Sequence, residues 1–159
     1  MAKPKFTKDT SEWNLIKRRL RKDKQSISDV GFFGKRYGVE NNNLPVAYIA
    51  QINNEGISVP PRPFMYKSIS DVKKSKHYKE LVVRCIRDIA DGRMDRKEAN
   101  TMLGNYLKAV IEQNIEDWTN PSNSPKTILM KGRNDPLIDT GTMLGSVEVK
   151  TKKTGRNSK

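Results

Sequence analysis

The sequence predicts an α+β protein, because two different apolar periods occupy different parts of the chain. Apolar residues recur at helical spacing over 78–91 and again over 99–118. Polar and apolar residues alternate in the manner of a half-buried strand at both ends, over 26–34 and over 146–151. Shorter helices and basic termini complete the expected architecture.

Composition limits the classes of partner and site. The chain of 159 residues suits one domain with a modest core. Lysine and arginine total 31 against 18 acids, and the formal net charge of +13 favours polyanions or acidic protein surfaces. Cys85 is the only cysteine, so we expect a core thiol, no disulfide framework and a reducing compartment. No apolar run reaches the roughly 18 residues of a membrane helix, so we expect a soluble protein made in the cytoplasm, without a membrane partner.

The N-terminal part is strongly basic. Residues 1–10 are expected to form a flexible arm. A short helix is predicted from 12 to about 23, where Trp13, Ile16 and Leu20 recur at helical spacing. The densest basic cluster lies around this helix and either faces a polyanion or is a solvated helix face. The candidate residues are Lys17, Arg18, Arg21 and Lys22.

The first strand, over 26–34, leads through a polar loop to a helix that Pro45 starts and Gly56 ends. The prolines at 60, 61 and 63 then impose extended backbone, so Arg62 and Phe64 project in fixed directions, as in an interface or a buried anchor. The lysine-rich stretch 66–79 is interpreted as a polar loop. His77, the only histidine, is expected on the surface.

The best-defined elements are the two long helices. Gly92 stops the first, over 78–91. Asp95 and Glu98 have the spacing of a capping box at the start of the second. Both helices are expected in the core, with Met102, Tyr106 and Trp118 packing rather than lining a ligand site.

The closing segment, 135–150, is predicted to form a turn, one helical turn from 141 to 144 capped by Asp139 and Thr140, and a strand. A breaker run at 120–125 and a short apolar piece at 128–130 precede it. The one domain is expected to extend over 11–151, and 152–159 to form a flexible basic tail. Lys152 and Lys153 are further candidates for contact with DNA or acidic proteins.

Catalytic motifs are sparse. The glycines at 31–38 lack the lysine and hydroxyl of a phosphate-binding loop, and a lone histidine gives no metal or relay site, so we assign no catalytic residue, metal or cofactor. The single enzymatic pattern is Asp135 with Glu148 and Lys150, which is typical of metal-dependent nucleases. It is kept as an alternative.

Three blocks resemble the tail-completion or neck proteins of tailed bacteriophages, the virion morphogenesis or putative tail-component family. The first joins 30–34 to 46–56, the second is 57–65, and the third is 136–147. Their order, with two helices between the second and third, carries the resemblance over 26–150. The matching residues, which the resemblance implies serve fold and interface, are Pro60, Pro61, Arg62, Pro63, Phe64, Leu137, Asp139, Thr140, Gly141, Leu144 and Ser146.

The resemblance implies a small, twisted, mostly antiparallel sheet packed against two long helices. Such subunits form a ring, expected to be a hexamer, that caps the head-proximal end of the tail and joins it to the head connector. The implied partners are tail terminator or tail tube proteins, connector or adaptor proteins and the genomic DNA in the lumen. The implied location is the virion neck, after assembly in the host cytoplasm. The role is structural, not enzymatic; a sequence-independent nucleic-acid-binding protein is the alternative.

Overall fold

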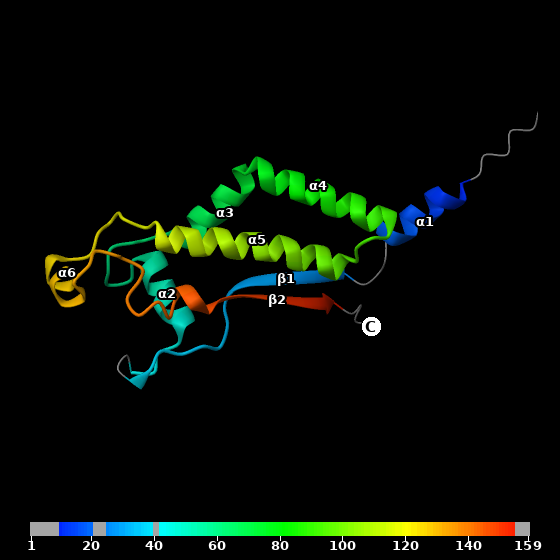
Figure 1. Cartoon of the computed structure of the whole chain (residues 1–159). Helices are drawn as coiled ribbons and strands as arrows, with labels where there is room; N and C mark the ends of the chain where they lie inside the picture. The colour runs from blue at the N-terminus through cyan, green and yellow to red at the C-terminus, as the bar shows by residue number, and fades with distance from the viewer. Residues whose placement is uncertain (1–9, 21–24, 40–41, 155–159) are drawn as a thin grey trace, which may run out of the picture.

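The computed structural model describes residues 10–20, 25–39 and 42–154, and there the protein has the expected α+β fold. α5 runs lengthwise between two layers, with α3 and α4 on one side and the sheet of β1 and β2 on the other (Figure 1). The elements are α1 (Ser11–Leu20), β1 (Gln25–Phe32), α2 (Val46–Glu55), α3 (Phe64–Lys74), α4 (Lys76–Asp91), α5 (Arg96–Glu116), α6 (Pro125–Lys131), the 3-10 turn η2 (Leu144–Ser146) and β2 (Val147–Thr154).

Some predictions fall outside this description. Residues 1–9 of the expected arm and 155–159 of the expected tail are not described, and neither are Arg21 and Lys22. The strand β2 continues through Lys152 and Lys153, so the tail boundary predicted at 152 is wrong by three residues. None of the described helices combines the length and the apolar character needed to cross a membrane.

The sheet joins the two ends of the chain. β1 and β2 are antiparallel, with a register that runs from Ser26 opposite Lys153 to Phe32 opposite Val147. Gly104 lets the sheet approach α5 closely, because a Cβ there would lie 2.7 Å from a methyl carbon of Val149. The sheet therefore packs closely on α5 at Gly104, where the helix has no side chain.

The main core lies around the C-terminal half of α5. There the start of α3, the helix α2 and the closing segment meet, and the ring of Phe64 packs edge-on against Phe32 with 6.3 Å between centroids. The buried apolar side chains of this cluster are Val46, Ala50, Phe64, Ile111, Ile115, Leu137, Met143 and Val147. Residues 128–130, by contrast, form part of α6, where Leu129 and Met130 are largely exposed.

The prediction of a loop over 66–79 is wrong. α3 occupies most of it, and the buried residues Phe64, Ser68 and Val72 recur every four positions on one side of that helix. Ser75 then breaks the helical path with extended backbone, and its hydroxyl accepts a hydrogen bond from the Tyr78 N–H at 3.1 Å to cap α4. The buried stripe is narrow and partly polar, which explains why the composition is that of a loop.

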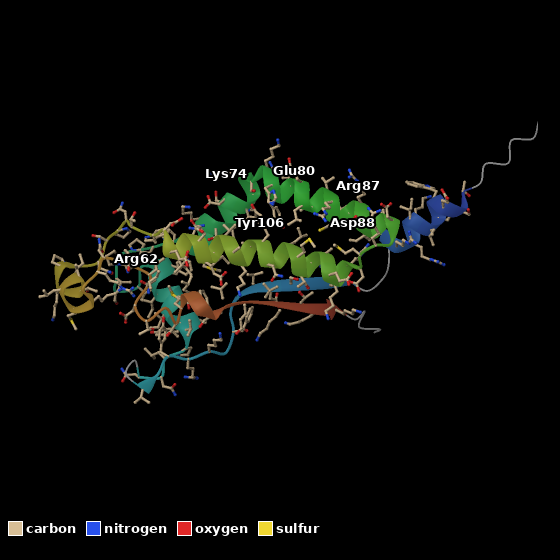
Figure 2. All side chains as sticks on the ribbon, in the orientation of Figure 1. Arg62, Lys74, Glu80, Arg87, Asp88 and Tyr106 are labelled. Atoms are coloured by element: carbon tan, nitrogen blue, oxygen red, sulfur yellow. The ribbon has the colours of Figure 1, made fainter. Side chains whose placement is uncertain are left out.

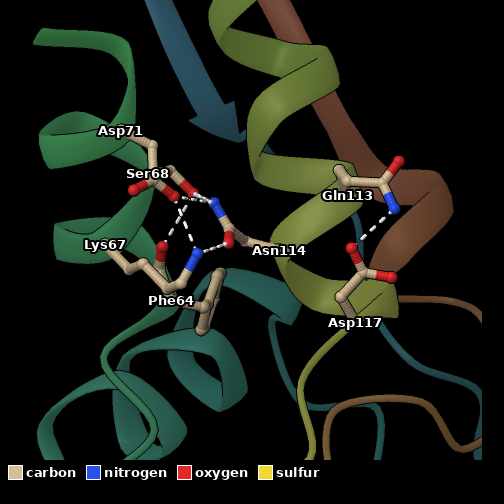
Figure 3. A network of polar contacts seen from close by, with 7 residues as sticks. All are labelled: Phe64, Lys67, Ser68, Asp71, Gln113, Asn114 and Asp117. Atoms are coloured by element: carbon tan, nitrogen blue, oxygen red, sulfur yellow. Dashed lines mark hydrogen bonds and ion pairs between the residues drawn. The ribbon is translucent and has the colours of Figure 1, made fainter. Parts of the chain in front are cut away.

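A polar network holds α3 on α5 (Figure 3). The buried Asn114 donates to the Ser68 hydroxyl (3.0 Å) and to Asp71 (3.1 Å), and it accepts from Lys67. Lys67 also pairs with Asp71 at 2.8 Å, and these bonds hold the pKa of that carboxyl below its usual value. Ser68, the buried polar residue of α3, thus bonds to Asn114 of α5 and to the Phe64 carbonyl of its own helix at 2.7 Å.

The two long helices differ in burial. α5 contributes to the core along its length, whereas α4 buries only Cys85 completely among its described residues. The Cys85 thiol lies 4.0 Å from the sulfur of Met102, and burial raises its pKa, as expected for a core thiol. Ile86, which the apolar stripe placed in the core, is 51% exposed, so that part of the prediction is wrong.

The predicted capping box at the start of α5 is confirmed, and it makes stability depend on pH. Asp95 accepts the Glu98 N–H at 2.8 Å, which depresses the pKa of the Asp95 carboxyl in the folded protein. A depressed pKa stabilises the fold above the unfolded value of about 3.9 and ceases to do so as the pH falls through the folded pKa. We expect Asp95→Asn, which keeps a capping oxygen, to lose about 0.5 kcal/mol at pH 7. In thermal melts this difference from the wild type should shrink as the pH falls below the unfolded value of about 3.9 and through the folded pKa; a constant difference would contradict it.

Candidate functional site

Arg62 is a buried anchor. Its side chain extends from the proline block into the end of the molecule that holds α2 and the loop before α6 (Figure 2), and it is only 7% exposed. Its guanidinium donates to the Asn53 side chain at 2.9 Å and to the carbonyl of Pro121 at 3.2 Å. Its other terminal nitrogen donates to Ser122 O and Asn123 Oδ1, both at 3.3 Å.

No carboxylate is among these acceptors, and burial lowers the Arg62 pKa. Of the two roles the sequence left open, the structure therefore favours the anchor. Phe64 is buried beside it, whereas the prolines at 60, 61 and 63 stay on the surface. The block thus turns its arginine and its aromatic ring inward, and its remaining motif residues outward.

Two cations hold the closing segment. The Lys131 ammonium donates to the carbonyls of Asp135 (2.8 Å) and Ile138, and burial lowers its pKa. Arg133 donates to the carbonyl of Asp139 at 2.5 Å. The predicted helical turn is present, because the Gly145 N–H donates to the Gly141 carbonyl at 2.9 Å, and it continues into η2. The cap differs from the prediction, since Thr140 accepts only weakly, at 3.4 Å from the Thr142 nitrogen.

The motif residues of this segment separate into two groups. Leu137 and Ser146 are buried and Leu144 is half-buried, so they serve the core. Asp139 and Thr140 are exposed and line a cavity of about 100 Å³ with Tyr37, whose pKa is raised by burial and by the charge of Asp139. Ligand sites commonly measure about 300–1,000 Å³, so this cavity is too small for a nucleotide.

The sheet has two open edges. Each strand pairs only with the other. Apart from the Val147 N–H, which bonds to Leu144, and the Ser26 carbonyl, which accepts from the Asn100 side chain, no backbone group of either strand has a further partner in the described part of the chain. β1 carries no lysine over its eight residues, whereas β2 carries Lys150, Lys152 and Lys153. A long unprotected strand edge is a template for pairing with another chain.

The basic candidates of α1 and β2 are not one cluster. Lys17 and Arg18 point to solvent on α1, with Lys17 over the Trp13 ring. Lys152 pairs with Asp29 at 3.0 Å. Lys153 instead lines a groove beside the start of α5, together with Arg19 and Arg96.

The sequence does not distinguish Arg19 from its basic neighbours, so its structural role could not be predicted. Its guanidinium donates to the Ala90 carbonyl at 2.8 Å and lies over Gly92, and so fastens α1 to the end of α4. Within the basic run of α1, this residue is used for structure.

The two carboxylates of the nuclease-like pattern each form ion pairs with basic side chains. Asp135 pairs with Arg133 at 3.2 Å, and Glu148 lies between Lys35 (3.5 Å) and Lys150 (4.0 Å). Across the described ranges there is no group of three or more acidic, histidine or cysteine side chains placed to hold a metal ion. What the geometry offers instead is open strand edges and exposed basic helix faces.

Neither a known protein-family model nor a curated protein nor a solved structure matches this chain.

Proposed function

We propose that this protein is a structural assembly subunit that closes the head-proximal end of a bacteriophage tail as a ring and joins it to the head connector. The observation that carries the proposal is the two-stranded sheet with two open edges. The pair of strands is stabilised by packing on α5, and further strands from another chain would satisfy the free backbone groups at its edges.

Charge favours one way of pairing. β2 against β2 would bring the lysines at 150, 152 and 153 of two copies together, which is repulsive. β1 has no lysine, and its acid Asp29 pairs with Lys152 of its own sheet at 3.0 Å, so β1 of one copy against β2 of the next avoids this repulsion. Such head-to-tail contacts repeat around an axis and give a closed ring when the rotation fits.

The resemblance supplies the rest of the proposal. It covers the proline block and the closing segment, which here meet near the core at the C-terminal half of α5. The exposed residues of these blocks, such as Pro60, Asp139 and Thr140, then remain for contacts with tail terminator, tail tube or connector proteins. The expected ring is a hexamer in the virion neck, around a lumen through which the genomic DNA passes.

Particles assembled with and without this protein test the role directly. Negative-stain images should show that its absence gives tails with an unfinished upper end that fail to join filled heads. Normal infectious particles in its absence would refute the proposal.

A charge change at the sheet edge tests the mode of assembly. Asp29→Lys should reduce ring formation at least about tenfold in light scattering, because it places a lysine on β1 against the lysines of β2 in the next copy. Circular dichroism should show that the variant, which also loses the ion pair with Lys152, is a folded monomer. Glu116→Lys, the same charge change at the exposed end of α5, is the matched control and should assemble normally. Equal assembly of both variants would exclude pairing through β1.

A further inference from the structure

We propose that the outer face of α3 and α4 binds the phosphate backbone of double-stranded DNA without reading its sequence. This surface, the α3–α4 ridge, exists only because most of 66–79 is helical. It is formed by Lys73, Lys74, Lys76, Lys79, Arg84 and Arg87, all exposed, and Glu80 is the acid among them.

Helix geometry puts these residues on one side. In α4, positions 76, 79, 80, 83 and 87 fall on one face, because three- and four-residue steps return to the same side of a helix. The buried Cys85 lies on the opposite face, toward α5. Figure 2 shows Lys74, Glu80 and Arg87 on the outer side of α3 and α4, with Asp88 and Tyr106 on the side of α5. The ridge therefore faces away from the rest of the molecule.

The bend at Ser75 makes the ridge protrude. α3 and α4 meet there at an angle, on the side of α5 that faces away from the sheet (Figure 1). The four lysines of the ridge flank this bend on both sides, which suits contact with an extended, convex polymer. The 16 residues of α4 span about 24 Å, enough to meet phosphates along more than half a turn of duplex.

Much of this charge is uncompensated. Lys76 lies 3.7 Å from Glu80, but both are strongly exposed, and Arg84 pairs with Asp88 at 3.7 Å. Lys73, Lys74, Lys79 and Arg87 have no carboxylate within 4.0 Å in the part of the chain that the structure describes. Weakly paired, solvated cations can neutralise phosphates and release counterions without breaking strong ion pairs.

The chemistry of the face favours DNA over protein or lipid. Protein interfaces have broad apolar or aromatic centres and few lysines. On the α4 face, Val83 is the one apolar residue among the six that line a shallow depression, and the other five are charged. A helix bound in a membrane surface inserts a broad apolar face, but the apolar face of α4 packs on α5.

Four of the six cations of the ridge are lysines, which favours contacts with phosphates over contacts with bases. Neither α3 nor α4 contains asparagine or glutamine, the residues that pair with adenine edges. Lysine acts as a point charge toward phosphate.

This inference does not depend on ring assembly, and the isolated protein tests it. Fluorescence anisotropy with a 20-base-pair duplex should give binding whose log K falls linearly with log salt. K73Q/K74Q/K79Q/R87Q should weaken binding at least about tenfold near 0.1 M salt and lower the slope by about 0.9 for each phosphate that the variant no longer neutralises. Circular dichroism and thermal melts of the variant should match the wild type, since these side chains are exposed.

The matched control removes the same charge elsewhere. K17Q/R18Q/K152Q/K153Q neutralises the basic residues that the sequence singled out, and it should retain most of the affinity. Equal losses of affinity in both variants would show that net charge alone acts, and no binding of the duplex would also overturn the inference. Tighter, ridge-dependent binding of poly-glutamate than of DNA would point instead to an acidic protein and overturn it too.

Discussion

Gly104→Val should lower the melting temperature by about 6–12 °C, because the variant forces the sheet away from α5. A Cβ at this position would already lie 2.7 Å from the Val149 methyl and 3.3 Å from the Ser28 Cβ. The branched side chain adds further atoms in the same space, and both strands depend on contact with α5. Overpacking of this kind costs about 3 kcal/mol, and 1 kcal/mol shifts the midpoint by about 2–4 °C in a chain of this size.

The control for Gly104→Val is Asn105→Val, the next residue of α5, whose side chain is exposed. It introduces the same β-branched residue into the same helix, so it reports the change in helix propensity alone. Gly104→Ala should fall between them, because about 1 kcal/mol of helix propensity opposes the contact with Val149. If both valine variants melt together, the sheet does not rest on Gly104.

The sequence predicted what depends on local pattern. The α5 helix has a capping box at one end and a long apolar stripe, and both signals lie within the element itself. The strands β1 and β2 each show a two-residue period, so their existence was predictable. Their mutual pairing was not, because it joins residues such as Ser26 and Lys153 from opposite ends of the chain.

The helix α3 escapes prediction for a related reason. Its buried side holds Ser68 between Phe64 and Val72, and this serine bonds both to the Phe64 carbonyl of its own helix and to Asn114 of the distant α5. The composition of 66–79 records the solvated lysines and not this distant partner. A loop over these residues gives the lysines no common face, so the α3–α4 ridge could not be foreseen.

The proline block shows the same limit at the level of single residues. Backbone restriction by the prolines predicted that Arg62 points in a fixed direction. The acceptors that surround it come from α2 and from the loop at 121–123, about sixty residues away. A sequence pattern does not show which distant residues will supply these acceptors.

Arg62→Met should cost about 4 kcal/mol and lower the melting temperature by about 8–16 °C. Methionine keeps much of the side-chain length but leaves the carbonyls of Pro121 and Ser122 and the amide oxygens of Asn53 and Asn123 without their donor. Each buried acceptor left unpaired costs about 1–3 kcal/mol. The substitution also removes the cost of burying a charge that has no acid beside it, and this gain offsets part of that sum.

Two further variants separate charge from geometry. Arg62→Lys keeps the charge but lacks the planar fork that reaches acceptors on several sides, so it should recover less than half of the stability that Arg62→Met removes. Arg36→Met removes an exposed guanidinium that donates to the Asn43 carbonyl, and it should change the midpoint little. If Arg62→Met melts like the wild type, water serves the four acceptors and the arginine is not an anchor. The arginine would then be free to contact a partner, and the proline block would be an interface rather than a part of the core.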